Sequence, residues 1–156
     1  MLFSLSLAKR LLVIIVLIAS ISSMVLAQTT RNLPLQQLGI GYGPTDLVAH
    51  PDGKRFISAG ARGAFLFDEE TGDLLRVFYG HQNEVTSIDL SSDGNLLLTG
   101  SLDHTARLWN VNSGNELLTL NGHSQSIETV SLSGDGTLAV TGSQDDTVRL
   151  WDLSSG

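Results

Sequence analysis

Two histidine–aspartate pairs with the same spacing are the residues of this chain whose types are best suited to chemistry. His81 is followed by Asp103, and His123 is followed by Asp145 at the same separation. An imidazole held by a carboxylate makes up two of the three members of a catalytic triad, in which the histidine acts as the general base. The pair occurs twice, whereas an active site is needed only once in a chain. We therefore interpret both pairs as structural and expect no catalytic residue and no enzymatic activity here.

Both pairs belong to a longer motif that recurs after 42 residues. A Gly-His dipeptide at 80–81 recurs at 122–123, and the segment 99–110 recurs as 141–152, each copy running from Thr-Gly-Ser to Leu-Trp and then Asn or Asp. A fixed period of about 40–45 residues, with Gly-His near one end and Trp-Asp near the other, is typical of a β-propeller blade. The candidate residues are therefore positioned by a repeated structural unit.

The elements between these motifs are predicted to be short antiparallel strands. In the middle copy, residues 84–90, 96–101, 105–111 and 116–120 carry strand patterns and are separated by Asn, Asp, Ser and Gly, which favour turns. The neighbouring copies repeat these strands, and no helical periodicity appears after residue 27. The predicted fold class is therefore all-β, preceded by an N-terminal hydrophobic leader helix.

Residues 39–156 resemble the WD-repeat (WD40) β-propeller family. The second and third copies carry its full pattern, from Gly-His through Asp-Gly and Thr-Gly-Ser-x-Asp-x-Thr to Leu-Trp-Asn/Asp. The resemblance implies a partial β-propeller of about three blades: a degenerate blade at 39–79, a full blade at 80–121 and an incomplete blade at 122–156. In the degenerate copy, Ile40 stands in place of the histidine and Phe67 in place of the tryptophan.

The resemblance also assigns the repeated polar residues to a hydrogen-bonded network inside each blade. A buried tryptophan needs an acceptor for its indole N–H, and a threonine hydroxyl can accept that bond while it donates another. A carboxylate can orient the histidine ring and accept backbone N–H groups of its own turn. By position, the network consists of His81, Thr99, Asp103 and Trp109 in the full blade, and of His123, Thr141, Asp145 and Trp151 in the incomplete blade.

By the same resemblance, protein partners are expected to bind the loops that follow each Gly-His pair. The candidate binding residues are Gln82, Asn83 and Glu84 in one loop, and Ser124, Gln125 and Ser126 in the next. The alternative is that these loops are only solvated turns. His50 and His104 are expected to be exposed turn residues, and no two histidines have the spacing of metal ligands. We therefore predict no metal site and no cofactor.

The first 27 residues have the pattern of a secretory signal peptide. Two basic residues at 9–10 precede an apolar run at 11–19, and small residues stand before the expected cleavage between Ala27 and Gln28. The mature chain would then be secreted or periplasmic. The alternative is an uncleaved membrane anchor that leaves the repeats facing the outside. Residues 28–38 match no repeat and are interpreted as a linker or a single outer strand.

The composition limits the remaining function classes. The chain has no Cys, which excludes disulfides, and its net charge of −7 disfavours binding to nucleic acid. We therefore expect an exported, non-enzymatic, protein-binding scaffold that meets a membrane only through an uncleaved leader. The alternative is a substrate-recruiting arm of a secreted enzyme whose catalytic domain lies beyond residue 156.

A closed propeller needs about four to eight blades, which is more than these residues supply. The chain is therefore expected to be the N-terminal piece of a longer propeller protein. The alternative is a natural short form that completes a ring by self-association.

Overall fold

The computed structural model describes residues 43–154. Every regular element in this part of the chain is a β-strand, which confirms the all-β prediction. Over the same residues, no helix has the length and apolar character needed to cross a membrane. The leader at 1–27, residues 28–38 and the start of the first copy at 39–42 lie outside the described residues. The leader helix, the cleavage site and the outer strand therefore stay predictions.

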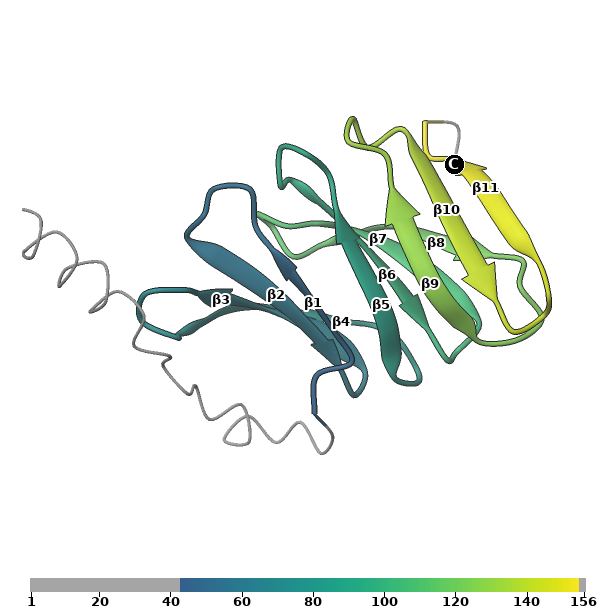
Figure 1. Ribbon diagram of the computed structural model, residues 1–156, viewed down its shortest axis with the longest axis horizontal. Coiled ribbons are helices and arrows are strands. Elements are labelled where there is room, and N and C mark those ends of the chain that lie inside the picture. Colours follow the sequence, from purple (N-terminus) through teal and green to yellow (C-terminus); the bar gives the residue numbers. More distant parts are fainter. Residues whose placement is uncertain (1–42, 155–156) are drawn as a thin grey trace, which may run out of the picture. The chain divides into compact units, whose positions relative to one another are not determined.

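Three antiparallel sheets follow one another in chain order (Figure 1). The first sheet contains β1 (Asp46–Ala49), β2 (Arg55–Gly60), β3 (Gly63–Asp68) and β4 (Leu74–Tyr79). The second sheet contains β5 (Val85–Leu90), β6 (Leu96–Ser101), β7 (Thr105–Asn110) and β8 (Glu116–Asn121). The third sheet contains β9 (Ile127–Leu132), β10 (Leu138–Ser143) and β11 (Val148–Asp152). Within each sheet, every strand pairs with the next one along the chain.

Tight turns join the strands, and some of them require glycine. Gly94 follows Asp93 in the turn between β5 and β6 with a φ of 71°, and Gly136 takes the same place between β9 and β10 with a φ of 72°. A residue with a Cβ rarely adopts this left-handed backbone. The aspartate before each glycine accepts a backbone N–H two residues further on, from Asn95 and from Thr137. The repeated Asp-Gly is therefore a turn motif.

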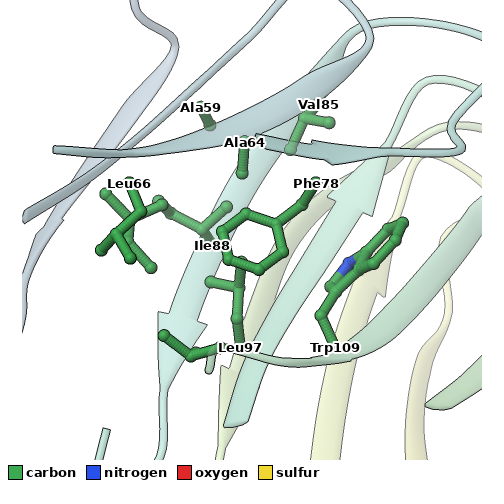
Figure 2. Close-up of a cluster of buried hydrophobic side chains, with 10 residues drawn as sticks. Ala59, Ala64, Leu66, Phe78, Val85, Ile88, Leu97 and Trp109 are labelled. Carbon is green, nitrogen blue, oxygen red and sulfur yellow. The ribbon is translucent and has the colours of Figure 1, made fainter. Parts of the chain in front are cut away.

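Two apolar cores separate the three sheets, because alternate residues of a strand point to opposite faces. In β6, Leu97 belongs to the core shared with the first sheet, and Leu98 belongs to the core shared with the third sheet. Figure 2 shows the first of these cores, in which the rings of Phe78 and Trp109 lie with centroids 6.1 Å apart. The second sheet is thus covered on both faces.

The second core joins the second sheet to β9 and β10. Leu98, Ala106 and Leu108 are buried there against Ile127 and Val130. Burying an Ile, Leu or Val side chain stabilises a fold by about 1.5–3 kcal/mol. These contacts therefore account for much of the attraction between the two sheets.

Hydrogen bonds also join the first strands of the second and third sheets. Thr86 Oγ1 of β5 donates to the Ile127 carbonyl at 2.6 Å. The next residue, Ser87, accepts the Val130 N–H on its Oγ at 3.3 Å. The two sheets are therefore fixed in register by polar contacts as well as by apolar ones.

The junction between the first and second sheets uses the same positions. Thr45 Oγ1 donates to the Val85 carbonyl. This bond corresponds to the one from Thr86 to Ile127 in the next copy. Asp46 Oδ2 accepts the Ile88 N–H at 2.9 Å. Successive sheets are therefore stacked by one repeated set of contacts.

Candidate functional site

Thr99 and Trp109 project from the same face of the second sheet. Leu97 of β6 pairs with Trp109 of β7, and Thr99 pairs with Arg107. Residues two positions apart in a strand point the same way, so the side chains of Thr99 and Trp109 lie next to each other. Trp109 belongs to the first core, so both side chains face the first sheet.

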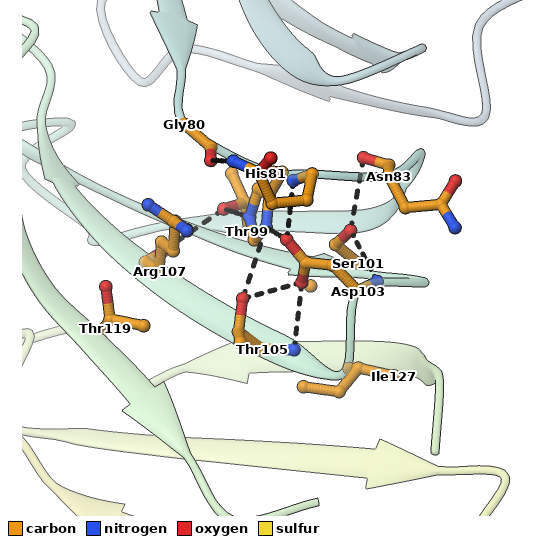
Figure 3. Close-up of polar contacts among 12 residues, drawn as sticks. Gly80, His81, Asn83, Thr99, Ser101, Asp103, Thr105, Arg107, Thr119 and Ile127 are labelled. Atoms are coloured by element: carbon orange, nitrogen blue, oxygen red, sulfur yellow. Dashed lines mark hydrogen bonds and ion pairs between the residues drawn. The ribbon is translucent and has the colours of Figure 1, made fainter. Parts of the chain in front are cut away.

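His81 and Asp103 complete a group of four side chains, which we call the first clasp. His81 Nδ1 lies 2.9 Å from Asp103 Oδ2, and His81 Nε2 lies 2.8 Å from Thr99 Oγ1. Trp109 Nε1 donates to the same Thr99 hydroxyl at 2.9 Å. Figure 3 shows His81 lying between Thr99 and Asp103. The clasp joins the segment after β4, strand β6, the β6–β7 turn and strand β7.

The proton positions in the first clasp follow from the chemistry of its members. The ionised carboxylate of Asp103 can only accept, so the Nδ1 of His81 carries the hydrogen that lies between them. The Nε2 of a neutral ring then accepts the Thr99 hydroxyl hydrogen. Because the Trp109 indole can only donate, the Thr99 hydroxyl accepts the indole hydrogen while it donates its own hydrogen to His81.

The third sheet contains a second clasp with the same geometry. His123 Nδ1 lies 2.8 Å from Asp145 Oδ2, and His123 Nε2 lies 2.7 Å from Thr141 Oγ1. Trp151 Nε1 donates to Thr141 Oγ1 at 2.9 Å. All eight residues that the sequence assigns to the two networks are therefore within hydrogen-bond distance of a partner.

The two clasp carboxyls are held in the ionised form. Burial favours the neutral form of Asp103, but hydrogen bonds from His81, Thr105 and the Gln82 N–H outweigh it and hold the pKa of Asp103 well below its usual range. The hydrogen bond from the Thr147 hydroxyl is the main cause that lowers the pKa of Asp145, against a smaller opposing effect of burial. Each carboxylate is thus a fixed acceptor.

Hydroxyl groups that were not predicted from the sequence support each clasp aspartate. Thr105 Oγ1 donates to Asp103 Oδ1 at 2.6 Å, and Ser101 Oγ accepts the Asp103 N–H at 3.1 Å. Thr147 and Ser143 make the same contacts to the aspartate of the second clasp. The signal was present in the repeated Ser-x-Asp-x-Thr.

The loops that were predicted to bind partners are attached to the clasps. The Gln82 N–H donates to Asp103 Oδ2 at 2.9 Å, and the Ser124 N–H donates to Asp145 Oδ2 at 3.0 Å. The side chains of Gln82, Asn83, Ser124 and Gln125 are exposed, while those of Glu84 and Ser126 are half-buried. The carboxylate that holds the histidine therefore also fixes the start of the exposed loop.

In the first sheet, Phe67 stands at the position of the clasp tryptophan, and the buried Ser58 stands at the position of the clasp threonine. The rings of Phe56 and Phe67 stack with centroids 5.2 Å apart. Phe65 meets the ring of Tyr79 edge to face at 5.9 Å. Ile40, the predicted replacement for the histidine, lies outside the described residues.

The expectation for His50 was wrong. His50 is buried rather than exposed, and its Nε2 lies 3.1 Å from the Gly94 carbonyl oxygen in the β5–β6 turn. It therefore links the first sheet to the second. His104 is exposed as expected, with a left-handed φ of 72°.

The clasp histidines are poorly placed for chemistry on an external molecule. Both nitrogens of His81 and of His123 have protein partners, and both histidine side chains are 0% exposed. Within residues 43–154, no group of three or more His, Asp or Glu side chains is arranged to hold a metal ion. The geometry can fix loops and strands, which is the property a binding platform needs.

Sequence relatives match short parts of this chain. A stretch of 50 residues is 48% identical to WD repeat-containing protein 18 of Bos taurus, and it covers 32% of this chain and 11% of that protein. A stretch of 77 residues is 34% identical to serine-threonine kinase receptor-associated protein of Dictyostelium discoideum, covering 49% of this chain and 26% of that protein. The matched stretches are therefore small parts of much longer relatives.

Solved structures share the fold over most of the chain. The structure of U3-55K superposes with a TM-score of 0.67 at 25% sequence identity, over 72% of this chain and 36% of that chain. The crystal structure of RRP9 WD40 repeats gives the same values.

The family model described as WD domain, G-beta repeat matches residues 72–110 and 114–152, which together make up half of the chain. Each matched segment ends with the β-strand that carries the tryptophan of one clasp. The sheets, the clasps and these matches agree, and the chain therefore belongs to the WD40 repeat family.

Proposed function

We propose that this chain is a protein-binding scaffold without catalytic activity of its own. The main support is that both clasp imidazoles are buried and bonded at both nitrogens, in two copies. A general base has to reach the proton of its substrate within hydrogen-bond distance. The clasps instead use their side chains to hold the strands and loops of one sheet.

The binding surface in this proposal is the pair of loops at 82–84 and 124–126. Both loops lie at the same end of their sheets, before β5 and before β9. Their first N–H groups are fixed by Asp103 and Asp145, while the amide side chains of Gln82 and Gln125 are exposed. A surface whose backbone is already ordered loses less conformational entropy when a partner binds.

Chemistry favours a protein as the partner. Exposed carboxamide and hydroxyl groups can donate to and accept from a peptide backbone. A net charge of −7 opposes the phosphate groups of nucleic acid. The relative from Dictyostelium discoideum is named for its association with a receptor, which is a protein partner.

We also propose that the chain acts outside the cytoplasm. The support is the pattern of residues 1–27, with basic residues before an apolar run and small residues before Gln28. Fractionation of the cells that make the chain, with N-terminal sequencing, tests this location. The expected product is exported and begins at Gln28, and a cytoplasmic product that begins at Met1 contradicts it.

The binding proposal is tested by affinity capture from the exported fraction of the same cells. The wild-type chain is expected to retain at least one protein that the double variant Gln82→Ala, Gln125→Ala loses. The matched control is Ser92→Ala with Asn112→Ala. Both are exposed turn residues that follow β5 and β7, at the end of the sheet opposite to the loops. The control is expected to retain that protein, and thermal melts should show that both variants are folded.

Two outcomes contradict the binding proposal. One is a loop variant that keeps every protein captured by the wild type, which removes these loops from the binding surface. The other is a loss of capture that the control variant shares, since the loss then does not depend on the loops.

A further inference from the structure

The backbone of the loop at 82–84 is bonded within its own sheet. The Asn83 carbonyl accepts a hydrogen bond from the Ser101 hydroxyl at 3.3 Å. The Glu84 carbonyl accepts the Leu102 N–H at 2.9 Å. The first N–H of the loop is held by the clasp carboxylate. A partner that reaches this loop therefore meets mainly its side chains.

The side chain of Gln82 has a fixed orientation. Its Nε2 donates to the Gly80 carbonyl at 3.0 Å. Because a carbonyl oxygen only accepts hydrogen bonds, the atom that faces it has to be the amide nitrogen. The side chain is exposed, and its Oε1 has no hydrogen-bond partner among residues 43–154. This oxygen is therefore available as an acceptor.

The Gly80 carbonyl that orients Gln82 belongs to a tightly packed piece of backbone. A Cβ on Gly80 would lie 2.8 Å from Arg107 Nη1 and 3.0 Å from Trp109 Cη2, so the chain lies directly on these two side chains. Trp109 is buried in the first core, and Arg107 is paired with Glu116. The carbonyl therefore has a fixed place, and so has the amide bonded to it.

The side chain of Asn83 is fixed in the opposite sense. Its Oδ1 accepts the Glu84 N–H at 2.9 Å. Since a backbone N–H only donates, the bonded atom has to be the oxygen. In the part of the chain that the structure describes, Nδ2 has no partner, and Figure 3 shows the carboxamide pointing away from the clasp. This nitrogen is therefore available as a donor.

The matching loop at 124–126 has similar backbone contacts but no such orientation. Ser143 Oγ donates to the Gln125 carbonyl at 3.1 Å, which repeats the contact of Ser101. Over the described residues, the side chains of this loop form no hydrogen bond of their own. The two loops therefore share a backbone frame and differ in the groups that they present.

A fixed acceptor beside a fixed donor matches one residue of an extended peptide. In an extended chain, the N–H and the C=O of one residue point to the same side, as they do towards a paired strand. The N–H can donate to Gln82 Oε1, and the C=O can accept from Asn83 Nδ2. Neither carboxamide is charged, so this contact selects the backbone of the partner rather than the charge of its side chains.

We propose that the loop at 82–84 recognises an extended peptide segment of the partner through its backbone, with Gln82 and Asn83 as the residues that determine this specificity. This recognition rests on the proposed function, which places the loop in the binding surface. The loop at 124–126 then has a supporting role.

Short peptides selected from a random-sequence display library on the purified full chain are the probe, and their affinity is measured by fluorescence anisotropy. Asn83→Asp is the central variant, because its carboxylate still accepts the Glu84 N–H but has no hydrogen to donate. It should weaken peptide binding by about tenfold. Gln125→Glu is the matched control, since it adds the same charge at the same position of the other loop, and it should bind like the wild type.

Methylated peptides test whether the backbone is recognised. Each residue of a selected peptide is N-methylated in turn, which removes one backbone N–H. At one position, methylation should weaken binding to the wild type by about tenfold. It should leave binding to Gln82→Ala unchanged, because that variant has already lost the acceptor.

Three results overturn this proposal and leave the proposed function intact. A wild-type chain that captures a protein through its loops but selects no peptide recognises a folded surface instead. Asn83→Asp that is folded by circular dichroism and binds the peptide like the wild type removes the donor from the contact. Methylation that weakens the wild type and Gln82→Ala equally at every position removes the acceptor. Failure of the proposed function differs from all three, because the double loop variant then keeps every captured protein.

Discussion

At the residue scale, one threonine hydroxyl is the centre of each clasp. Thr99 Oγ1 lies within 2.9 Å of both the Trp109 indole nitrogen and the His81 Nε2. Within the first clasp, the Trp109 indole N–H has no other acceptor, and His81 Nε2 has no other donor. Since an unpaired buried polar group costs about 1–3 kcal/mol, losing this hydroxyl should affect both partners together. The threonine, the tryptophan and the histidine of a clasp are therefore expected to occur together.

Acid should destabilise the chain through its aspartates. The pKa of Asp103 and of Asp145 is lowered in the folded chain by hydrogen bonds, and the pKa of Asp93 and Asp135 is lowered to about 2. The unfolded chain therefore takes up protons first as the pH falls below the ordinary value of 3.8. The free energy of unfolding should fall between about pH 4 and pH 2, while these groups leave it unchanged above about pH 5.

The measurement is urea unfolding at a series of pH values. Asp103→Asn should be less stable at neutral pH and should lose less stability between pH 4 and pH 2 than the wild type, because one linked carboxyl is gone. A wild type whose urea midpoint is flat across that window contradicts the linkage. If the free energy of unfolding of Asp103→Asn falls with pH as steeply as that of the wild type, Asp103 does not contribute to the pH dependence.

The sequence indicates which residues meet in each clasp, because four polar types recur together at one step. His50 could not be placed in this way. Its partner, the Gly94 carbonyl, lies 44 residues further along the chain and in another sheet. The supporting hydroxyls of Thr105 and Thr147 were visible as a repeated type, but their role depends on turn geometry that the spacing does not specify.

At the scale of elements, the strands were predictable because each sheet is a meander of hairpins. A strand of this kind pairs with its neighbour in the chain, so local turn residues and alternation are sufficient. The contacts between sheets were less predictable. Thr86 donates to Ile127 across 41 residues, and such a contact depends on how two folded sheets stack.

Gly100, near the end of β6, gives a prediction at the same scale. Gly100→Ala places a methyl group 2.6 Å from Val130 Cγ1 in the close-packed second core, so it should destabilise the chain by about 1–3 kcal/mol. Gly142→Ala is the matched control, because its methyl would meet only the Thr129 side chain at 2.9 Å, and Thr129 is exposed and can rotate away.

Thermal or urea unfolding of the two glycine variants measures this difference. Gly100→Ala should lower the midpoint clearly, while Gly142→Ala should stay close to the wild type. Equal losses at both positions would mean that the second and third sheets are not packed at Gly100 as described.

At the scale of the whole molecule, the chain is a series of similar units. The second sheet is covered on both faces, whereas the third sheet has one covered face and one exposed face. The apolar cores lie between the sheets, whereas each clasp joins the strands and loops of one sheet. Stability therefore depends on stacking between neighbours, while the geometry of each loop depends on its own sheet.

Each repeat folds as one sheet with its own clasp, and the two tryptophans of the chain report on this directly. The measurement is hydrogen exchange of the two indole N–H groups by ¹H–¹⁵N NMR, in the wild type, in Thr99→Val and in Thr141→Val. Both signals should be protected in the wild type, Thr99→Val should shift and expose mainly the signal of Trp109, and Thr141→Val mainly that of Trp151. Wild-type indoles that exchange as fast as those of a free peptide, or one variant that changes both signals equally, would contradict the account.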